Sequence, residues 1–599
     1  MIYHCEDHTC NYWDEGEKLP ERCPQCGRKL LRANEADMTG DDWTALGNTL
    51  WDAEASDKKR MVDCFRKAAY LGSAWGVCNL GICMEQGNGV EADPVQAFWL
   101  YQQAVEMGSL NAVCCLGVCY EYGIGTAPDA EKAAELYCKA AEYGSPRGQM
   151  LLAHAFHDGI GVEADAAEAV YWVRAAAYQR YGEGMHRLGV CYAYGDGVEQ
   201  NWEHAVHWFR EAAESGVSAA MTDLGYCYEK GCGVEQSWEQ AFSWYRRGAE
   251  CGYPVSMSNL GLCYKRGYGV EQNWQEAIKW YEQGAQCGNL QSMHNLACCY
   301  ERGEGVEQNE DRAFYWYRRS AEGGNGDAMC NLGRCYKRGY GVEQNWQEAV
   351  KWYEQGAQCG NLQSMHNLAC CYERGEGVEQ NMTEAIRWYT AAAEGGNTDD
   401  MYNLGWQYDH GEGVEQDMKK AICWYERAAE QNHPAAMNSL GECYAMGQGV
   451  PRDLETAMEW YRRAAELGEA MADYNMGWHL EQAGKLSEAY AHYRKAADGN
   501  DDSAWWALGR FYENGVVVAQ DGKEARRCYE TGEKLGSVKC KMRLARCRLL
   551  GIGGRREKKA GLDLCRQALE LAKESSEKED YGYEAEMNLL RRTIAENES

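Results

Sequence analysis

The sequence is poor in proline and histidine, and it has no long apolar segment. Proline occurs 8 times and histidine 13 times in 599 residues. No run of about 18 apolar residues is present, which is the length that a membrane-spanning helix needs, so we expect no membrane partner. The N-terminal stretch MIYHCEDHTCNYWDEGEKLPERC lacks the charged and apolar segments of a secretion signal. These absences together predict a cytoplasmic protein.

Positive charge is scarce as well. Lys and Arg total 61 against 92 Asp and Glu, which gives a formal net charge of −31. Nucleic acids and anionic membranes both bind proteins through clustered cationic side chains. We therefore expect no nucleic acid along the main body of the chain, and we favour a basic or amphipathic protein partner.

Glycine is abundant, and much of it is periodic. A Gly-x-Gly pair recurs every thirty-six residues, and it begins at positions 87, 123, 159, 195, 231, 267, 303, 339, 375, 411 and 447. A period of this length is typical of a solenoid, in which each repeat contacts only its neighbours. The usual product of such an array is a long surface rather than one catalytic pocket.

Each repeat encodes two helices, here called helix A and helix B. In residues 255–288, apolar residues at helical spacing predict helix A, which Gly267 ends. Asn273 and Glu276 resemble a capping box and predict the start of helix B, which Gly288 ends. The repeat therefore predicts an antiparallel helix pair joined by a sharp glycine turn.

Two positions are invariant among the eleven regular repeats. The position of Leu260 is always Leu, and the position of Ala277 is always Ala. Small residues at fixed helical positions let two helices approach closely, and bulky Trp and Tyr fill the groove between layers. These positions therefore indicate a packed core that continues from one repeat to the next.

The pattern A-x-x-x-L-G-x-x-Y-x-x-G-x-G-V, followed by A-x-x-W-Y-x-x-A-A-x-x-G, resembles the Sel-one-like repeat family, a branch of the tetratricopeptide-type solenoids. The resemblance covers about residues 43–555. It implies an all-α, right-handed superhelix of paired antiparallel helices and a role as a scaffold or adaptor. At this length we expect about 15 helix pairs, together with a small N-terminal zinc ribbon.

The periodicity also predicts the domain organisation. Residues 1–32 form a separate cysteine module, and residues 41–555 form the repeat array, with regular repeats over about 73–470. Residues 556–599 are highly charged, as expected of a polar terminal cap.

Two repeats were copied as a block. Residues 257–309 match residues 329–381 with only three changes. An array tolerates such a duplication because each repeat contacts only its neighbours.

The N-terminal module has four cysteines with metal-ligand spacing. Cys5 and Cys10 form one pair and Cys23 and Cys26 the other, and two such pairs suit one tetrahedral, structural zinc ion. His8 is an alternative ligand to Cys10. Free thiols or disulfides remain the plain alternative, and a rubredoxin-like iron site is disfavoured because it uses Cys-x-x-Cys in both halves. A weaker alternative is nucleic-acid contact through the basic residues Arg22, Arg28, Lys29 and Arg32.

The other cysteines recur at fixed repeat positions without a recurring partner, and 30 occur in all. We expect them to be small buried residues in a reducing compartment. Some cysteine-rich secreted members of the resembled family have been linked to penicillin binding or hydrolysis, and these pair cysteines between the two helices of a repeat. Because that pairing is missing here, a hydrolase of this type is only the alternative function.

A polar stripe on helix A is the candidate partner site. In four successive repeats it consists of Asn, Cys and Arg at i, i+4 and i+7, and its Asn and Arg donors suit carboxylates and peptide backbone. The predicted contact residues are Asn259, Arg266, Asn295, Arg302, Asn331, Arg338, Asn367 and Arg374. The alternative is that the cysteines (Cys263, Cys299, Cys335 and Cys371) pack in the core and the arginines are merely solvated.

A neighbouring position alternates in charge along the array. It is occupied in turn by Lys265, Glu301, Lys337 and Glu373. We interpret the alternation as pairing between adjacent helices, with each exposed pair contributing about 0–1 kcal/mol.

Nothing in the pattern points to catalysis. His294 and His366 are equivalent copies in the duplicated block, so one structural role accounts for both. Each Gly-x-Gly ends a helix rather than joining a strand to a helix, which disfavours a phosphate loop. We therefore predict a non-enzymatic scaffold that binds a protein or peptide along the array.

Overall fold

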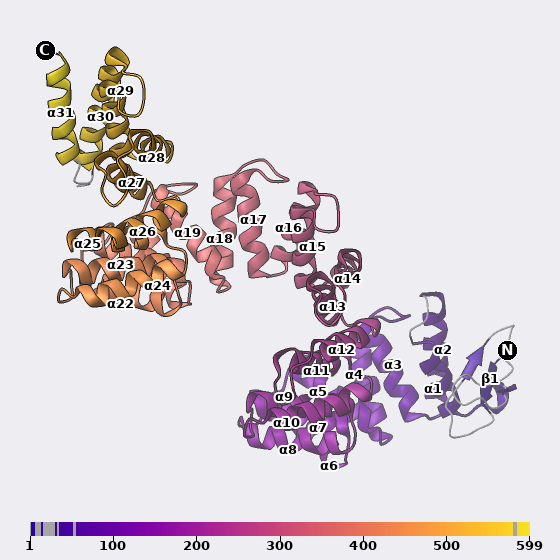
Figure 1. The fold of residues 1–599 in the computed structure, drawn as a ribbon. Coiled ribbons are helices and arrows are strands. Elements are labelled where there is room, and N and C mark those ends of the chain that lie inside the picture. Colours follow the sequence, from indigo (N-terminus) through magenta and orange to yellow (C-terminus); the bar gives the residue numbers. More distant parts are fainter. Residues whose placement is uncertain are drawn as a thin grey trace. The chain divides into compact units, whose positions relative to one another are not determined.

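The computed structural model divides into two compact units, Met1–Asn309 and Glu310–Ser599 (Figure 1). It describes residues 2–5, 13–15, 30–32, 35–51, 55–578 and 584–598.

The first unit starts with three short strands and continues with paired helices. Its elements are β1 (Ile2–Cys5), β2 (Trp13–Glu15), β3 (Leu30–Arg32), the 3-10 helix η1 (Glu35–Asp37), α1 (Gly40–Thr49), α2 (Ala55–Tyr70), α3 (Ala74–Gln86), α4 (Pro94–Glu106), α5 (Leu110–Tyr122), α6 (Ala130–Glu142), α7 (Pro146–Asp158), α8 (Ala166–Tyr178), α9 (Gly182–Tyr194), α10 (Trp202–Glu214), α11 (Ser218–Lys230), α12 (Trp238–Glu250), α13 (Pro254–Arg266), α14 (Trp274–Gln286) and α15 (Leu290–Arg302).

In the second unit, all regular elements of the described residues are helices. Its elements are α16 (Glu310–Glu322), α17 (Gly326–Arg338), α18 (Trp346–Gln358), α19 (Leu362–Arg374), α20 (Met382–Glu394), α21 (Thr398–His410), α22 (Met418–Glu430), α23 (Pro434–Met446), α24 (Leu454–Glu466), α25 (Ala470–Gln482), α26 (Leu486–Asp498), α27 (Asp502–Asn514), α28 (Gly522–Lys534), α29 (Val538–Leu550), α30 (Lys558–Lys578) and α31 (Glu584–Glu598).

Successive helices pack as pairs, and successive pairs stack within each unit. Odd-numbered helices are helix A and even-numbered helices are helix B, so α13 and α14 form one pair and α17 and α18 another. Each of these helices contacts the helix before it and the helix after it along the chain. The predicted all-α solenoid of antiparallel helix pairs is therefore confirmed.

The strands lie in the predicted cysteine module. β1 pairs antiparallel with both β2 and β3, and Cys5 in β1 is the backbone partner of Leu30 in β3. Cys10, Cys23, Cys26 and His8 lie outside the described residues.

The two glycines of each turn have different roles. Gly267 ends α13 in the left-handed conformation, with φ +73°, and its N–H donates to the carbonyl of Cys263. Gly269 has φ +69°, and a Cβ on it would lie 2.1 Å from the carbonyl oxygen of Trp238, the first residue of the previous helix B. The second glycine is therefore the point where adjacent repeats touch backbone to backbone.

The core of each repeat is centred on a tyrosine of helix B. The largest fully buried side chains include Tyr101, Tyr137, Tyr245, Tyr281, Tyr317, Tyr353, Tyr425, Tyr461, Tyr493 and Tyr529. In the repeat of Tyr245, the ring packs on Gly225 of the preceding helix A, where a Cβ would lie 2.6 Å from it. Its hydroxyl donates to Glu229 at 2.8 Å. The same bond joins Tyr101 to Glu85, so helix A supplies both the space for the ring and an acceptor for its hydroxyl.

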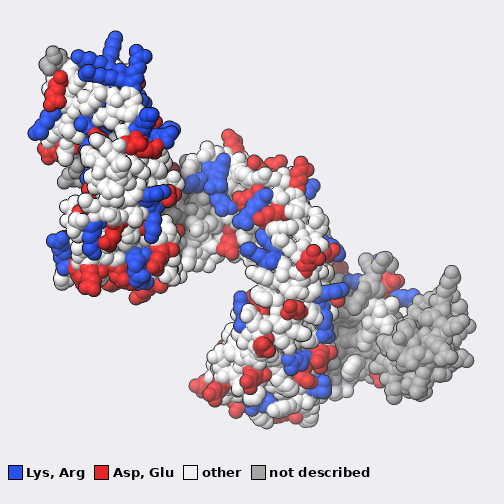
Figure 2. Space-filling view, viewed as in Figure 1, with Lys and Arg blue, Asp and Glu red and all other residues white. Residues whose placement is uncertain are grey.

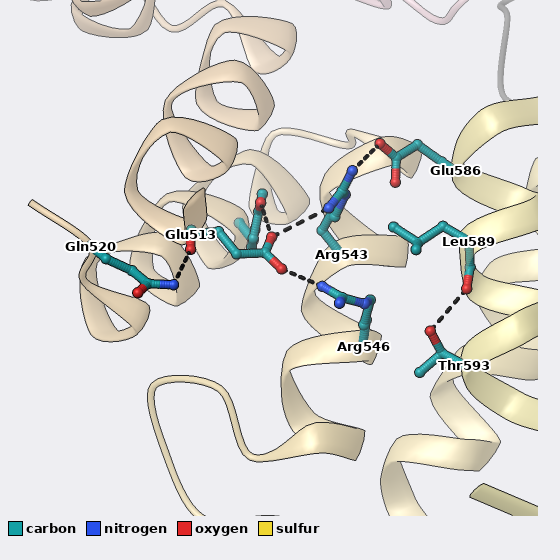
Figure 3. A network of polar contacts seen from close by, with 8 residues as sticks. Glu513, Gln520, Arg543, Arg546, Glu586, Leu589 and Thr593 are labelled. Atoms are coloured by element: carbon teal, nitrogen blue, oxygen red, sulfur yellow. Dashed lines mark hydrogen bonds and ion pairs between the residues drawn. The ribbon is translucent and has the colours of Figure 1, made fainter. Parts of the chain in front are cut away.

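A buried ion-pair network joins the last helices of the second unit (Figure 3). Glu513 of α27 accepts from Arg543 at 3.3 Å and from Arg546, both in α29. Arg543 also donates to Glu586 of α31 at 2.6 Å. Because Arg543, Glu513 and Glu586 are each at most 14 % exposed, these charges compensate one another within the stack.

Candidate functional site

One face of helix A is the candidate binding surface. Val255, Asn259, Leu262 and Arg266 lie at i, i+4, i+7 and i+11 of α13, so they share one side of the helix. None of the four is buried, and Arg266 is exposed. We call these four positions in every repeat the A-face.

The predicted contact residues, asparagines and arginines, lie on this face. The cysteines between them in the sequence do not. The asparagines at 259, 295, 331 and 367 are half-buried, and the arginines at 266, 302, 338 and 374 are exposed. The cysteines between them, Cys263, Cys299, Cys335 and Cys371, are at most 3 % exposed. The packing alternative for the cysteines is thus confirmed, and the exposed stripe runs through the position of Leu262 instead.

The asparagine position also contacts the preceding repeat. Asn367 Nδ2 lies 3.4 Å from Cys330 Sγ, and Asn475 Nδ2 donates to Asn438 Oδ1 at 3.0 Å. Both contacts join helix A to the previous helix A. These asparagines therefore serve the stacking of repeats, while the arginine position is turned to solvent.

Two lysines of the alternating series, Lys265 and Lys337, pair with acids outside that series. Lys265 Nζ pairs with Glu304 Oε2 at 3.3 Å, and Lys337 Nζ pairs with Glu376 Oε2 at 4.0 Å. Glu304 and Glu376 are the middle residues of the next Gly-x-Gly turn rather than residues of the next helix A. Glu373, which follows Lys337 in the series, accepts from the Tyr389 hydroxyl at 3.0 Å. The end of helix A therefore lies against the following turn, which brings these lysines to the turn acids.

In the first unit the A-face is hollowed into a cavity of about 680 Å³. Three consecutive A helices, α5, α7 and α9, supply its A-face lining, and α8 contributes to its floor. The lining includes Tyr122, Arg147, Leu151, His154, Glu183 and Arg187. It combines aromatic, aliphatic, cationic and acidic groups within one depression.

The charged and titratable groups of the cavity form a chain of polar contacts. His154 Nε2 lies 3.1 Å from Asp158 Oδ2, and His157 Nε2 lies 3.2 Å from Asp196 Oδ2. Asp196 is also 3.8 Å from Arg187. The hydrogen bond from His157 holds the pKa of Asp158 below its usual value. These carboxylates partly neutralise the positive charge of the cavity. Arg147, which also lines the cavity, adds positive charge.

Large apolar side chains are exposed on the same face elsewhere. They are Trp75, Tyr194, Tyr226, Val255 and Leu262 in the first unit, and Trp406, Met446, Met471 and Trp478 in the second. Trp75 is 57 % exposed and Tyr194 is 74 % exposed. Trp, Tyr and Met are enriched where proteins bind one another, and Trp and Tyr bury much area with few rotamers.

Charge is mixed over most of the visible surface, and basic side chains gather over α29 and its turn into α30 (Figure 2). That turn and the start of α30 contain the run RREKK at 555–559. Of the weaker nucleic-acid candidates, Arg22, Arg28 and Lys29 lie outside the described residues, and Arg32 ends β3.

No described helix is long and apolar enough to cross a membrane. Within the described ranges, three or more His, Cys, Asp or Glu side chains do not come together in a metal-binding arrangement.

The cavity was missed by sequence reasoning because the stripe was followed only through four central repeats. Its residues occupy the A-face positions of earlier repeats, where Arg147 replaces Val255 and Arg187 replaces Asn259. The A-face positions of all repeats, which include the position of Leu262 and not that of Cys263, contain the A-face lining of this cavity.

Comparison with known proteins agrees with this architecture. The family model for the Sel1 repeat matches residues 76–109, 112–145, 146–181, 182–217, 218–253, 254–289, 290–325, 326–361, 362–397, 398–433, 434–469, 470–501, 504–537 and 538–573. Among curated proteins, no match was found.

Two solved structures are similar to the chain. One is c5321, a protective antigen of uropathogenic Escherichia coli with an SLR fold, which is 32 % identical over 75 % of this chain and 97 % of its own, with a TM-score of 0.49. The other is a Sel1 repeat protein from Oxalobacter formigenes, 28 % identical over 52 % of this chain and 89 % of its own, with a TM-score of 0.39. The chain belongs to the Sel1 repeat family, whose solenoids are typically non-catalytic modules for protein interaction.

Proposed function

We propose that the chain is a non-enzymatic scaffold that binds an extended segment of a partner protein along the A-face. The observation that carries this proposal is the cavity of about 680 Å³, whose lining comes from three consecutive A helices. A depression continuous across repeats suits an extended peptide, since a peptide also repeats its side chains at regular intervals.

The chemistry of the cavity suggests an amphipathic peptide. Arg147 and Arg187 present guanidinium groups that pair well with carboxylates. Tyr122 and Leu151 in the same lining offer apolar contact. A segment that alternates acidic with aromatic or aliphatic side chains satisfies both sets of groups.

The test is a peptide selection followed by affinity measurement. Peptides of about 12 residues, selected from a random library on the wild-type protein, are titrated by fluorescence anisotropy against the double variant Arg147→Ala/Arg187→Ala. Loss of two charge-assisted contacts is expected to weaken binding at least about tenfold. The matched control is Arg246→Ala, which removes an exposed arginine paired with Glu250 on helix B. Selected peptides that bind both variants as well as wild type would contradict the A-face as the binding surface.

We also propose that Cys5, Cys10, Cys23 and Cys26 hold one structural zinc ion. Four thiolates are a donor set that suits closed, tetrahedral zinc. The pairing of Cys5 with Leu30 supports the proposal, because it brings Cys5 beside a segment that begins four residues after Cys26. Such a site would fold a short module that has little core of its own.

Chelation tests the zinc proposal. A chelator is expected to release one zinc ion per chain and to leave the helical circular dichroism of the repeats unchanged, because the array has its own core. The released metal is measured by a colorimetric zinc indicator. Chelation that removes no zinc, or that melts the helices, would contradict the proposal.

A further inference from the structure

Three side chains of the second unit form a continuous chain of polar contacts. His366 and Cys370 lie one helical turn apart on α19, and His366 Nε2 is 3.6 Å from Cys370 Sγ. On its other side, His366 Nδ1 is 2.7 Å from Oδ1 of Asp400, which comes from α21 in the next repeat. The imidazole is thus held between a carboxylate and a thiol.

Asp400 is the fixed end of this chain. Its side chain is fully buried at 0 % exposure, and its second oxygen, Oδ2, has no hydrogen-bond partner among the described residues. A buried carboxylate is stable as an anion only beside a positive group, and His366 is the group that it contacts. The hydrogen bond from His366 to Asp400, followed by the contact with Cys370, raises the pKa of His366 to about 10.

Cys370 therefore lies beside an imidazole that is positively charged at neutral pH. Burial raises the pKa of the thiol, but the hydrogen bonds with His366 and Tyr389 outweigh burial, and the pKa lies below its ordinary value. Other charged or titratable groups near it include Tyr389 of α20, whose hydroxyl is 3.3 Å from Sγ, Glu373 of α19, which accepts from that hydroxyl, and the adjacent Cys371. Cys370 is only half-buried and occupies an A-face position, so small reagents reach it.

We propose that Cys370 is a nucleophilic thiol site, oriented by His366 and the buried Asp400, that reacts with small disulfides. The Cys370 thiolate attacks one sulfur of the disulfide, a new bond forms from Sγ to that sulfur, and the original sulfur–sulfur bond breaks. The leaving thiolate takes a proton from solvent. Cys370 is oxidised to a mixed disulfide while the reagent is reduced by the same two electrons.

The surroundings also set a preference among disulfides. Glu373 lies one turn from Cys370 on the same helix, and the chain has a net charge of −31. These carboxylates repel anionic disulfides, so neutral or cationic disulfides are the favoured class. The proposal is independent of peptide binding at the A-face, since it rests on the chemistry of these three side chains alone.

The duplicated block supplies a matched comparison within the same molecule. Helix α15 has the same sequence as α19, LQSMHNLACCYER, with His294 and Cys298 at the positions of His366 and Cys370. The residue that corresponds to Asp400 two repeats earlier is Ala328. Cys298 therefore follows a histidine at the same spacing as Cys370 does, but the sequence has alanine at the position that corresponds to Asp400.

The test is the rate of mixed-disulfide formation with the neutral probe 4,4′-dithiodipyridine at pH 6 and pH 9. Sites are identified by mass spectrometry after cleavage at lysine, which separates residues 280–337 from residues 352–419 even though the two helices are identical. Cys359, an exposed cysteine in the same fragment as Cys370, is the reference for an ordinary thiol.

At pH 6 an ordinary thiol is almost wholly protonated, so Cys370 is expected to react at least about tenfold faster than Cys359 and than Cys298. At pH 9 an ordinary thiol is largely ionised, so the greater exposure of Cys359 should remove most of the difference. Asp400→Asn and His366→Gln are each expected to slow Cys370 at pH 6 with little change in the rate of Cys359. Folding of the variants is checked by circular dichroism. Because the comparison of Cys370 with Cys298 and Cys359 in the wild type needs no variant, a Cys370 that reacts no faster than both at pH 6 would overturn the proposal.

Discussion

At the scale of single residues, the glycine turn has the clearest physical requirements. Gly267 needs the left-handed conformation because it ends α13. Gly269 needs it too, but it also lies against the backbone of Trp238 in the previous repeat. Periodicity alone predicts a hinge at both positions, whereas the contact between repeats becomes visible only in three dimensions.

The substitution Gly269→Ala tests this distinction. Its Cβ would overlap the Trp238 carbonyl, at 2.1 Å, so the two repeats must move apart. We expect a loss of at least about 2 kcal/mol in the local free energy of unfolding. Amide hydrogen exchange of α12 to α14 measures that loss.

The matched control is Gly288→Ala. Gly288 has φ +84°, but a Cβ there would have nothing within 4 Å. Gly288→Ala should lower the free energy of unfolding only by the backbone strain, about 1 kcal/mol. Both variants reduce the freedom of the unfolded chain to the same extent. Equal losses at Gly269 and Gly288 would mean that the close approach between repeats does not limit stability.

The Cys370 site could not be predicted from the residues that surround it in the sequence. His294 and His366 have identical neighbours in the sequence, so one role was predicted for both. The difference between them lies two helices later, at Ala328 and Asp400, and the bond from His366 to Asp400 joins residues of adjacent repeats. Periodic patterns compare equivalent positions, and they do not reveal contacts between different positions of neighbouring repeats.

At the scale of helices, the sequence predicted the end of α13 and the start of α14 correctly, whereas α14 ends at Gln286, with Cys287 rather than Gly288 as its C-cap. The predicted N-cap Asn273 accepts from the N–H of Glu276 at 3.2 Å, and α14 begins at the next residue, Trp274. Gly267 follows the last residue of α13, as predicted. Boundaries are predictable here because caps act locally, within three or four residues.

The exposed face of each helix was harder to predict than its ends. The stripe was placed through Cys263, one residue away from its actual course through Leu262. One residue on a helix turns the side chain by about 100°, so this small difference exchanges a core position for a surface position. Both positions carry cysteine in α15 and α19, and for that reason composition could not separate them.

The helices α29 and α31 are joined by an ion pair as well as by apolar contacts. Arg543 occupies the A-face position of Asn259 in α29, and it lies between Glu513 and Glu586 (Figure 3). α31 therefore docks on α29 through a compensated ion pair as well as through buried Met587 and Leu590.

At the scale of the whole molecule, the chain is a sum of repeats whose contacts are local. Contacts of one repeat reach the neighbouring repeats through the turn glycine, the asparagine position and the lysine of helix A. A chain built in this way should accept the removal of whole repeats wherever the new junction recreates the old contacts. The duplicated block provides such a junction.

Deletion of residues 273–344 removes two repeats and joins Gln272 to Asn345. Helix B at the junction then reads WQEAVKWYEQGAQ in place of WQEAIKWYEQGAQ, a single change of Ile278 to Val. The following residues, through Asn381, are identical to those removed. We expect the same helical circular dichroism per residue and a melting temperature within about 4 °C of the full chain, because an Ile-to-Val change costs only about 0.5–1.5 kcal/mol.

The control is a deletion of one and a half repeats, residues 273–326, which joins Gln272 to Asp327. It places the sequence of a helix A where helix B is required, so the buried tyrosine and the N-cap of helix B are both lost at the junction. This shorter deletion should lower the melting temperature and the helical signal far more than the longer one. If the two deletions destabilise the chain equally, the stability of the array depends on interactions beyond neighbouring repeats, and the same dependence would make a long binding surface sensitive to changes far from the bound segment.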